Sequence, residues 1–502
     1  MARARVVTLD VGTGSVRSCI YSIAKNEVVA VASRSCSIEH PGPFLAEWEP
    51  DKWRAAVLGT IADAVRQARQ PAEAYVGITV ASLRQGFVLL DKNREPVARG
   101  VLNYDRRGAD YIPWIERVMP IDRLYALTGH WHAPELTLPK LLWFQHRCPN
   151  VWARVRHFLF VHDWVLLLLT GRCATAASLT TAGQMGDCTA RTWAVDLLTS
   201  LGVPVDILPN VMEGGSLLGG LLPAVAAHVG LESGLPVYVG GGDTQFGSLG
   251  TGGMVPGVAV IVGGSTTPIM MTTDRPLFDP LRRPWVSPHA MEGLWAVETN
   301  AGHTGMIYRW FRDTFGQAQV VRAVAQGRDS YALLDDLADA SPIGANGLLI
   351  VAANPRWSQE TWQQKAPYIF FNFRVSHTVG DVARAIMEGV CFGVRGNLDE
   401  LERVAGQPFS RVVFTGGSSH APVWAQMMAD VTGRPLVVPH VPEPAAVAGA
   451  MLVQRSVGES APVRSPVADH YLPDEERTKA YEPLYHRYLE VFQHMQRDFA
   501  EA

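Results

Sequence analysis

The sequence has no excess of positive charge. Its 44 lysine and arginine residues are outnumbered by 48 aspartate and glutamate residues, so the formal net charge is −4. Proteins that hold nucleic acid or an acidic membrane surface through charge need a strong positive field. The composition therefore argues against nucleic-acid binding and against attachment to a membrane surface.

Cysteine is also rare. The chain has six cysteines, and no two of them form a Cys-x-x-Cys pair. A chain of 502 residues can build a core without disulfide staples, and a zinc site needs clustered cysteine and histidine. We therefore expect free thiols in a reducing cytoplasm and no zinc site. The cysteines are Cys19, Cys36, Cys148, Cys173, Cys188 and Cys391.

Long hydrophobic runs are absent. The longest apolar stretch, 164–169, directly follows Asp163 and is far too short to cross a bilayer. The apolar run near the N-terminus meets Asp10 too early for a signal peptide. Hydrophobic residues make up 47% of the chain and charged residues 18%, which is typical of folded proteins. We therefore expect a soluble, cytoplasmic protein, and its 502 residues predict two to four domains.

Strands separated by small turns occur in two places. Near the N-terminus, two β-branched segments flank a turn with Gly12 and Gly14, and no helical pattern follows as a dinucleotide-binding unit would require. The same order of strand, small polar turn and strand returns near residue 264. The sequence therefore predicts two similar strand-turn-strand units. The predicted strands are 5–10, 16–23 and 28–38, then 258–263 and 268–273, and the predicted helices include 50–68, 381–401, 422–432 and 444–453.

The two turns have the composition of a phosphate-binding site. Successive amides left open by small residues form an anion nest, and hydroxyl groups on Thr13, Ser15, Ser265 and Thr266 add hydrogen-bond donors. Two such turns that face each other across a cleft can clamp a polyphosphate.

Two aspartates end strands of these units. Asp10 can hold a magnesium ion through water, and Asp243 can accept the proton of a hydroxyl group that attacks a terminal phosphoryl group. Each motif also has a plainer interpretation, namely an ordinary turn, a helix cap at Asp243, or a strand-to-helix turn at Gly416 and Gly417. Their joint order along the chain favours one common site.

Four motifs define that order. They are Asp10-x-Gly-Thr-Gly-Ser15, Gly240-Gly-Gly-Asp-Thr-Gln245, Val262-Gly-Gly-Ser-Thr266 and Thr415-Gly-Gly-Ser-Ser419. Together they resemble the FGGY carbohydrate kinases, which belong to the sugar kinase, Hsp70 and actin superfamily. The resemblance implies an α/β fold with two ribonuclease H-like domains and a cleft between them. It also implies a kinase that transfers the γ-phosphoryl group of MgATP to a sugar or polyol hydroxyl.

The resemblance extends to domains and to single positions. It implies a sugar-binding domain at 1–252 and a nucleotide-binding domain at 253–502, whose final helices can pack back on the first domain. It makes Asp243 the general base and places Asp10 and Asp243 beside the metal, with ATP and Mg²⁺ as cofactors. The implied ATP-binding residues are Gly12, Thr13, Gly14, Ser15 and Arg17 in the first unit, Gly264, Ser265 and Thr266 in the second, and Gly416, Gly417 and Ser418 at the adenosine.

The acceptor-binding region is similar to the autoinducer-2 kinase branch of this family. The similarity lies in Arg84-x-Gly86 and Asn103-x-Asp105-x-Arg107, and the Met-His-Gly typical of xylulose kinases is missing from the first segment. It implies a linear precursor of autoinducer-2 as acceptor, although Gln85 replaces an acidic residue of that branch. The implied acceptor-binding residues are Arg84, Gln85, Asn103, Asp105, Asp243 and Gln245.

Other functions stay open on the sequence. The chain can be a xylulose kinase or another pentulose or polyol kinase. The presence of Asp10 and Asp243 disfavours a non-catalytic sugar- or nucleotide-binding member, and the Trp- and His-rich insert at 103–187 disfavours an actin-like ATPase. The expected partners are ATP and a small sugar-like substrate, and a homodimer is among the open assemblies. Three residues can belong to a pocket or to the core, namely His289, His303 and Trp310.

Overall fold

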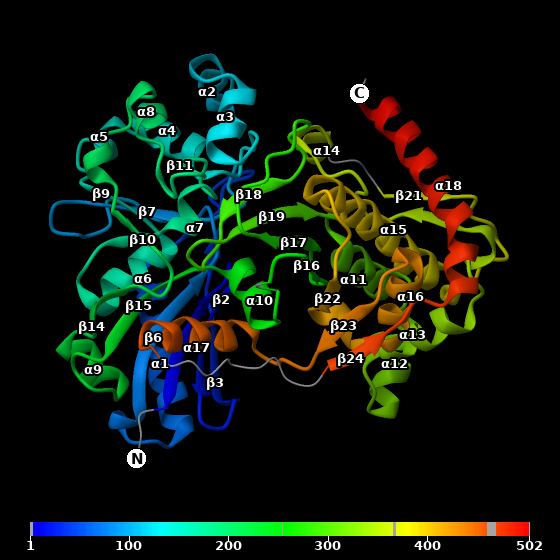
Figure 1. The fold of residues 1–502 in the computed structure, drawn as a ribbon, viewed down its shortest axis with the longest axis horizontal. Coiled ribbons are helices and arrows are strands. Elements are labelled where there is room, and N and C mark those ends of the chain that lie inside the picture. Colours follow the sequence, from blue (N-terminus) through cyan, green and yellow to red (C-terminus); the bar gives the residue numbers. More distant parts are fainter. Residues whose placement is uncertain (1–3, 254, 365–367, 459–467, 501–502) are drawn as a thin grey trace.

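Two α/β halves make up the protein, each built around one large sheet (Figure 1). The computed structural model describes residues 4–253, 255–364, 368–458 and 468–500. The chain completes the first sheet before it enters the second, and a late helix, α17, returns to the first half.

The first sheet has six strands in the order β14-β15-β6-β1-β2-β3. The strands β1, β2 and β3 form an antiparallel meander, and β6 and β15 run parallel to β1. The strand bounds are Arg5–Val11 (β1), Ser15–Ser22 (β2), Glu27–Ser35 (β3), Tyr75–Ser82 (β6), Leu217–Gly220 (β14) and Pro236–Gly242 (β15).

The second sheet repeats this topology. Its order is β18-β19-β17-β16-β22-β23-β24, with an antiparallel meander of β16, β17 and β19 and with β22 and β23 parallel to β16. Without the edge strands β14, β18 and β24, both sheets have the strand order 3-2-1-4-5, so the predicted pair of ribonuclease H-like units is confirmed. The bounds are Val258–Val262 (β16), Pro268–Thr273 (β17), Trp285–Pro288 (β18), Trp295–Asn300 (β19), Arg411–Thr415 (β22), Leu436–Pro439 (β23) and Ala468–Tyr471 (β24).

A smaller sheet and a group of helices extend the first half. The sheet has the order β4-β5-β8-β7-β9, and its last strand is distant in the chain from the other four. Its strands are Ile38–Glu39 (β4), Glu47–Trp48 (β5), Phe87–Leu90 (β7), Gly100–Val101 (β8) and His157–Phe160 (β9). The helices that follow are Ile112–Val118 (α2), Ile121–Thr128 (α3), Thr137–Arg147 (α4), Pro149–Trp152 (α5), Val161–Thr170 (α6), Ala177–Thr180 (α7), Val195–Ser200 (α8) and Pro223–Val229 (α9).

Helices with a regular apolar stripe form where the sequence predicts them. Helix α1, Pro50–Ala68, starts with proline at its first position, and its Trp53, Val57 and Ile61 are fully buried. The other long helices are Thr304–Thr314 (α11), Gln317–Gln326 (α12), Ser330–Ala340 (α13), Val379–Ala405 (α15), Pro422–Thr432 (α16) and Glu475–Ala500 (α18).

Helix α17, Pro444–Ser456, joins the two halves. It follows the second sheet in the chain but packs against β1 and against α10, Asp243–Gly250, in the first half (Figure 1). A Cβ atom on Gly449 would lie 2.1 Å from the Thr8 hydroxyl, so the helix backbone directly contacts the strand. The C-terminal helix α18 instead packs on α16 and α15 in the second half.

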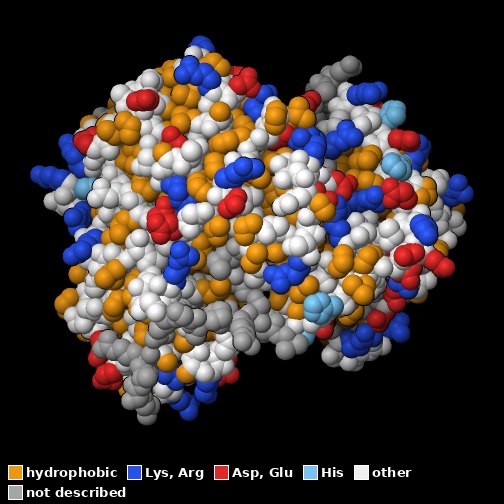
Figure 2. All heavy atoms as spheres, viewed as in Figure 1, with side chains coloured by type: hydrophobic (Ala, Val, Ile, Leu, Met, Phe, Trp, Pro, Cys, Tyr) orange, Lys and Arg blue, Asp and Glu red, His pale blue; other side chains and the backbone are white. Residues whose placement is uncertain are grey.

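The surface matches the nearly balanced charge of the chain. Acidic and basic side chains are interspersed over both halves on the face seen in Figure 2. No helix of the described residues is long and apolar enough to cross a membrane.

Candidate active site between the two sheets

The two predicted aspartates lie at the same edge of the first sheet. Asp10 is the penultimate residue of β1 and pairs with Ala81 of β6, which in turn pairs with Gly241 of β15. Asp243 follows β15 as the first residue of α10. Parallel strands end at one edge, so both carboxylates face the same side, with one strand between them.

Burial and neighbouring charges act on both acids. Burial is the main cause of the rise in the pKa of Asp10 to about 7, the negative charges of Asp243 and Glu443 contribute to that rise, and Arg17 opposes it. Burial also raises the pKa of Asp243, against the lowering effect of Arg84 and of hydrogen bonds from Thr244. The two carboxylates therefore share one electrostatic environment.

The Asp243 side chain is held by one of its two oxygens. Its Oδ1 accepts hydrogen bonds from the Thr244 amide at 2.7 Å and from the Thr244 hydroxyl at 3.2 Å. Within the described parts of the chain, no group donates a hydrogen bond to its Oδ2. This arrangement fixes the carboxylate and leaves one oxygen for a further donor.

The predicted phosphate turns lie at the corresponding edges of the two sheets. The turn of Gly12 closes through a 2.9 Å bond from its amide to the Ser15 carbonyl, and the Gly264 amide bonds similarly to Thr266 at 3.1 Å. The amides of Gly12 and Gly264 are therefore used to close their turns. The other amides and the hydroxyl groups of the turns are the candidate donors to phosphate. The Thr13 hydroxyl donates to Asn103 Oδ1 at 3.4 Å, so the first turn contacts the acceptor-binding segment.

The glycine pair at 416–417 packs directly on the second phosphate turn. Gly416 has a φ of +91°, and a Cβ there would lie 2.6 Å from the Gly263 carbonyl oxygen, so a side chain fits neither the backbone nor the space. Ser418 donates its amide to the same carbonyl at 3.1 Å. A Cβ on Gly417 would meet only that oxygen, at 3.9 Å, which leaves this face of the turn open.

Arg17 lies beside Asp10 but is paired with a residue from the end of the chain. Arg17 and Asp10 are cross-strand partners in β1 and β2, and Arg17 contacts Glu443 at 3.0 Å. Glu443 precedes α17, and the sequence interpretation missed it because a single glutamate between two prolines carries no local signal. The return of α17 to the first sheet therefore completes the surroundings of Asp10.

Arg84 forms an ion pair across the two halves. Its guanidinium makes two hydrogen bonds to Glu298 of β19, at 2.7 and 2.9 Å, and both side chains are about nine-tenths buried. A weaker contact of 3.4 Å reaches the Thr244 hydroxyl next to Asp243. The structure thus brings Arg84 close to Asp243, the predicted general base, and adds Glu298, which the sequence did not reveal.

A buried lysine holds the acceptor-binding segments. Lys140 of α4 is fully buried, and its ammonium donates to the carbonyls of Gln85 at 3.0 Å, Leu102 at 2.9 Å and Asn103 at 3.3 Å. The Thr137 hydroxyl donates to the Gln85 carbonyl as well, at 3.0 Å. Burial lowers the pKa of Lys140 to about 7. This residue fixes the backbones that carry Arg84, Gln85 and Asn103.

Asp105 is held by hydrogen bonds within the protein. It is fully buried, and its two oxygens accept hydrogen bonds from the Ala46 amide and from the amide and guanidinium of Arg107, at 2.7 to 2.9 Å. A carboxylate saturated in this way stabilises its loop. These contacts disfavour the prediction that Asp105 accepts hydrogen bonds from the substrate, which stays a prediction.

Gln245 and the three undecided residues also have defined places. Gln245 is fully buried and donates to the Pro288 carbonyl at 2.9 Å, so it links α10 to β18 of the second half. His289 is a core residue whose Nδ1 accepts from the Met291 amide, and burial lowers its pKa to about 4. His303 precedes α11, and Trp310 lies on the exposed side of that helix at 46% exposure.

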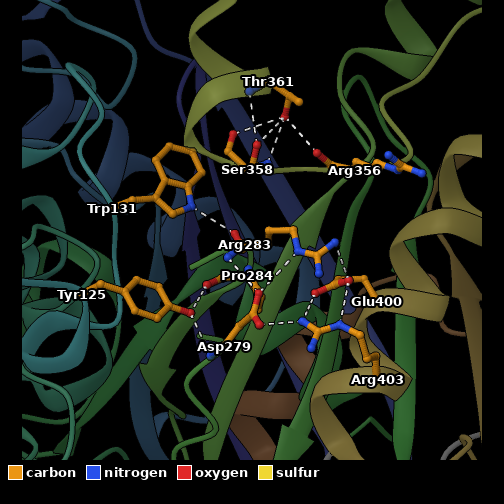
Figure 3. A network of polar contacts seen from close by, with 10 residues as sticks. All are labelled: Tyr125, Trp131, Asp279, Arg283, Pro284, Arg356, Ser358, Thr361, Glu400 and Arg403. Carbon is orange, nitrogen blue, oxygen red and sulfur yellow. Dashed lines mark hydrogen bonds and ion pairs between the residues drawn. The ribbon is translucent and has the colours of Figure 1, made fainter. Parts of the chain in front are cut away.

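A second set of contacts joins the halves beside this site (Figure 3). The Tyr125 hydroxyl donates to the Pro284 carbonyl at 2.7 Å, and the Trp131 indole donates to the Arg283 carbonyl at 3.0 Å. Arg283 is itself paired with Glu400 at 2.9 Å. These contacts and a cluster of tryptophans position the two halves relative to each other. The clustered tryptophans are Trp131, Trp285 and Trp357.

No cluster of three or more His, Cys, Asp or Glu side chains suited to a metal ion occurs in the ranges that the structure describes. Asp10 and Asp243 therefore offer two carboxylates at most. This donor set fits Mg²⁺ in kinases, because the ion takes most of its ligands from phosphate oxygens and retained waters.

Known proteins with the same arrangement are numerous. The family description "FGGY family of carbohydrate kinases" matches residues 5–250 with its N-terminal domain and 259–456 with its C-terminal domain. Autoinducer-2 kinases of Yersinia enterocolitica and Photorhabdus laumondii are each 31% identical to this chain, over 90% of it and 86% of their own length.

Solved structures agree on the two-domain sugar kinase fold. The xylulose kinase of Rhodospirillum rubrum has a TM-score of 0.88 at 26% identity, covering 99% of this chain and 100% of that one. The glycerol kinase of Plasmodium falciparum with ADP has a TM-score of 0.84 at 14% identity, covering 98% and 99%, which supports the fold alone. The repeated sheet topology and the two matching domains show that the chain belongs to the FGGY family of carbohydrate kinases.

Proposed function

We propose that this carbohydrate kinase phosphorylates a short, linear polyhydroxy carbonyl compound, with the precursor of autoinducer-2 as its preferred acceptor. The observation that carries the proposal is the proximity of Asp243 and Arg84 at the end of the first sheet, where the glycine-rich turn of Gly12 also lies. Arg84 is also bound to Glu298 of the second half. An acid, a forked donor and phosphate-binding turns in one place suit transfer to a hydroxyl group.

Asp243 acts as the general base in this reaction. Its Oδ2 takes the proton of the acceptor hydroxyl while that oxygen forms a bond to the γ-phosphorus of ATP. The bond between the γ-phosphorus and the bridging oxygen breaks, and ADP leaves with the electron pair. Thr244 holds Oδ1 throughout, so the carboxylate needs no reorientation.

ATP and magnesium occupy the space between the sheets in this proposal. The turns at 12–15 and 264–266 bind the phosphates, and the open face of Gly417 accepts the adenosine. Asp10 and Asp243 hold Mg²⁺, which neutralises charge on the transferring phosphoryl group when bound. Burial raises the pKa of Asp10 to about 7 and the negative charges of Asp243 and Glu443 add to that rise, and a cation at this position would offset both effects.

The acceptor is read by groups with fixed geometry. Arg84 offers donors in a rigid fork, and Lys140 sets the backbone positions of Gln85 and Asn103. A site built around hydroxyl groups rejects analogues that lack them. The similarity to autoinducer-2 kinases over 90% of the chain supports that acceptor class. Xylulose is the second candidate, because the xylulose kinase of Rhodospirillum rubrum covers the same fold over 99% of this chain.

A panel of acceptors tests the proposal. ADP release is measured with the autoinducer-2 precursor, D-xylulose, other pentuloses, pentoses and glycerol, with Asp243→Asn as the inactive control. We expect the highest kcat/KM for the autoinducer-2 precursor. A tenfold higher kcat/KM for D-xylulose would make D-xylulose the assigned acceptor and leave the kinase assignment intact. ADP release that does not depend on any acceptor would contradict phosphorylation of an acceptor.

A further inference from the structure

Strand β15 contains one extra residue just before the proposed base. Tyr238 pairs with Thr79 of β6, whereas Gly241 pairs with Ala81. Between these two pairs β15 advances by three residues and β6 by two. Such a β-bulge bends the strand and re-aims the side chains that follow it. The bulge ends two residues before Asp243 and therefore sets the direction in which that side chain leaves the sheet.

The bulge leaves one amide in need of a partner inside the core. Val239 keeps its pairing on the other side, because its amide bonds to the Ser216 carbonyl at 2.9 Å. At Gly240 the backbones are so close that a Cβ would lie 1.8 Å from the Val80 carbonyl oxygen. The Gly240 amide points instead to α6, where it donates to Nε2 of His162 at 3.1 Å.

His162 is held rigidly for this contact. It is fully buried, and since its Nε2 accepts from an amide, its proton is on Nδ1 and is donated to Oδ1 of Asp163 at 2.9 Å. The other carboxylate oxygen of Asp163 accepts the Phe160 amide at 3.0 Å, which anchors the start of α6. Both ring nitrogens are therefore used, and the ring cannot turn without losing both bonds.

We propose that His162, oriented by Asp163, is a positioning residue for Asp243, because it completes the hydrogen bonding of the bulge that aims the base. The inference rests on the proposed role of Asp243 as base. His162 contacts neither the acceptor nor ATP in this role and acts through the backbone of β15. Loss of its Nε2 acceptor lets the bulge relax, so Asp243 is displaced while the ligand-binding turns stay in place.

The test compares variants that differ in reach. His162→Gln can place an amide oxygen near the position of Nε2, whereas His162→Asn is too short and His162→Leu has no acceptor. We expect kcat to fall at least tenfold in His162→Leu and His162→Asn, with the KM values for ATP and acceptor changed less than threefold. His162→Gln should recover most of the lost kcat. If His162→Leu does not fold, the Gln and Asn pair decides.

Two controls separate positioning from general loss of stability. Thr170→Val removes another buried polar group of α6, whose hydroxyl donates to the Leu166 carbonyl and accepts from the Arg172 amide, both outside β15, and it should leave kcat unchanged. Hydrogen exchange of the peptide 236–242 should rise in His162→Asn and stay low in His162→Gln. Exchange that is equal in the two variants would overturn the inference without any assay of activity.

The remaining outcomes are distinguishable from failure of the proposed function. If Asp243→Asn abolishes turnover while His162→Asn keeps the wild-type kcat, the positioning role is wrong and the base assignment stands. If Asp243→Asn keeps turnover, the base assignment fails and this inference fails with it.

Discussion

The two sheets have one topology and different residues at equivalent edges. In the first half, the first and fifth strands of the repeated order end at Asp10 and Asp243. In the second half, the equivalent of the first strand ends at Gly263 and Gly264, and that of the fourth at Gly416. Both predicted acids, Asp10 and Asp243, therefore belong to the first half, whereas the equivalent turns of the second half present small residues and open backbone. The same framework thus carries different side chains in its two copies.

The largest effect should come from removing the acid of the first half. Asp243→Asn keeps the shape of the side chain and loses proton acceptance, so turnover should fall by about 10²–10⁴-fold. ATP should still bind with near-normal affinity, because its contacts lie in the turns. Steady-state kinetics and ATP titration of the folded variant check this. Near-normal turnover would place the base elsewhere.

The next effect tests whether the first half also reads the acceptor. Lys140→Met keeps the apolar length of the side chain but removes one donor from three carbonyls, of which that of Gln85 keeps the Thr137 hydroxyl. At about 1–3 kcal/mol for such a loss, the KM for the acceptor should rise about tenfold to hundredfold, with the KM for ATP unchanged.

A matched control exists for that variant in the second half. Arg384→Met also removes a buried cation that donates to backbone carbonyls, those of Ala338 and Ser341. Because it also leaves the buried Glu388 without its ion-pair partner, it should lower the thermal stability at least as much, and it should leave the acceptor KM unchanged. Equal changes of the acceptor KM in both variants would show that Lys140 acts only on stability.

The third prediction addresses the second half. Gly417→Val has room in the protein itself, so it should interfere only with bound nucleotide and raise the KM for ATP by about tenfold. Gly416→Ala has no such room at a φ of +91° and should reduce stability instead. Kinetics with ATP and acceptor varied separately will distinguish them. A rise confined to the acceptor KM would remove this turn from the nucleotide site.

The smallest effect concerns pH and the Asp10 carboxyl. Its pKa is about 7 in the folded protein against 3.8 in the unfolded chain, so the folded state loses stability as pH rises from about 4 through 7. Asp10→Asn removes this loss. At pH 8 without Mg²⁺ the variant should be more stable than the wild type by about 1–2 kcal/mol. The difference is kept this small because solvent screens the half-buried carboxylate. Denaturant unfolding at pH 4 should give equal free energies of unfolding for the variant and the wild type. The same difference at pH 4 and pH 8 would contradict titration of Asp10 as its cause.

Elements with a strong local pattern were predicted well from the sequence. The helices at 50–68 and 422–432 and the strand at 268–273 have the predicted bounds. Proline at the first helical position and a regular apolar stripe act within a few residues, so they are readable without the fold. The strand at 157–160 was not predicted, because its short apolar run is indistinguishable from the helix that follows.

The site was predicted only in part. Glycine-rich turns and the acids at strand ends have a local signature, and the structure places the acids and the first turn at one end of the first sheet and the other two turns at one end of the second. The predicted role of Asp105 toward the substrate stays a prediction, which its hydrogen bonds to Arg107 disfavour. Glu298, Glu443 and Lys140 were missed as functional residues, since each acts through a partner distant in the chain.

The sequence by itself determined the strands, the turns and the order of the motifs, because these follow from residue periodicity and backbone preference over short distances. Only the tertiary structure decided which charges meet. Arg84 and Glu298 are 214 residues apart in the chain, and Arg17 and Glu443 are 426 apart. Lys140 donates hydrogen bonds to backbone carbonyls. Every residue has a carbonyl, so no sequence pattern predicts which ones a lysine will contact. Long-range pairs of this kind exist only once both sheets have formed and packed together.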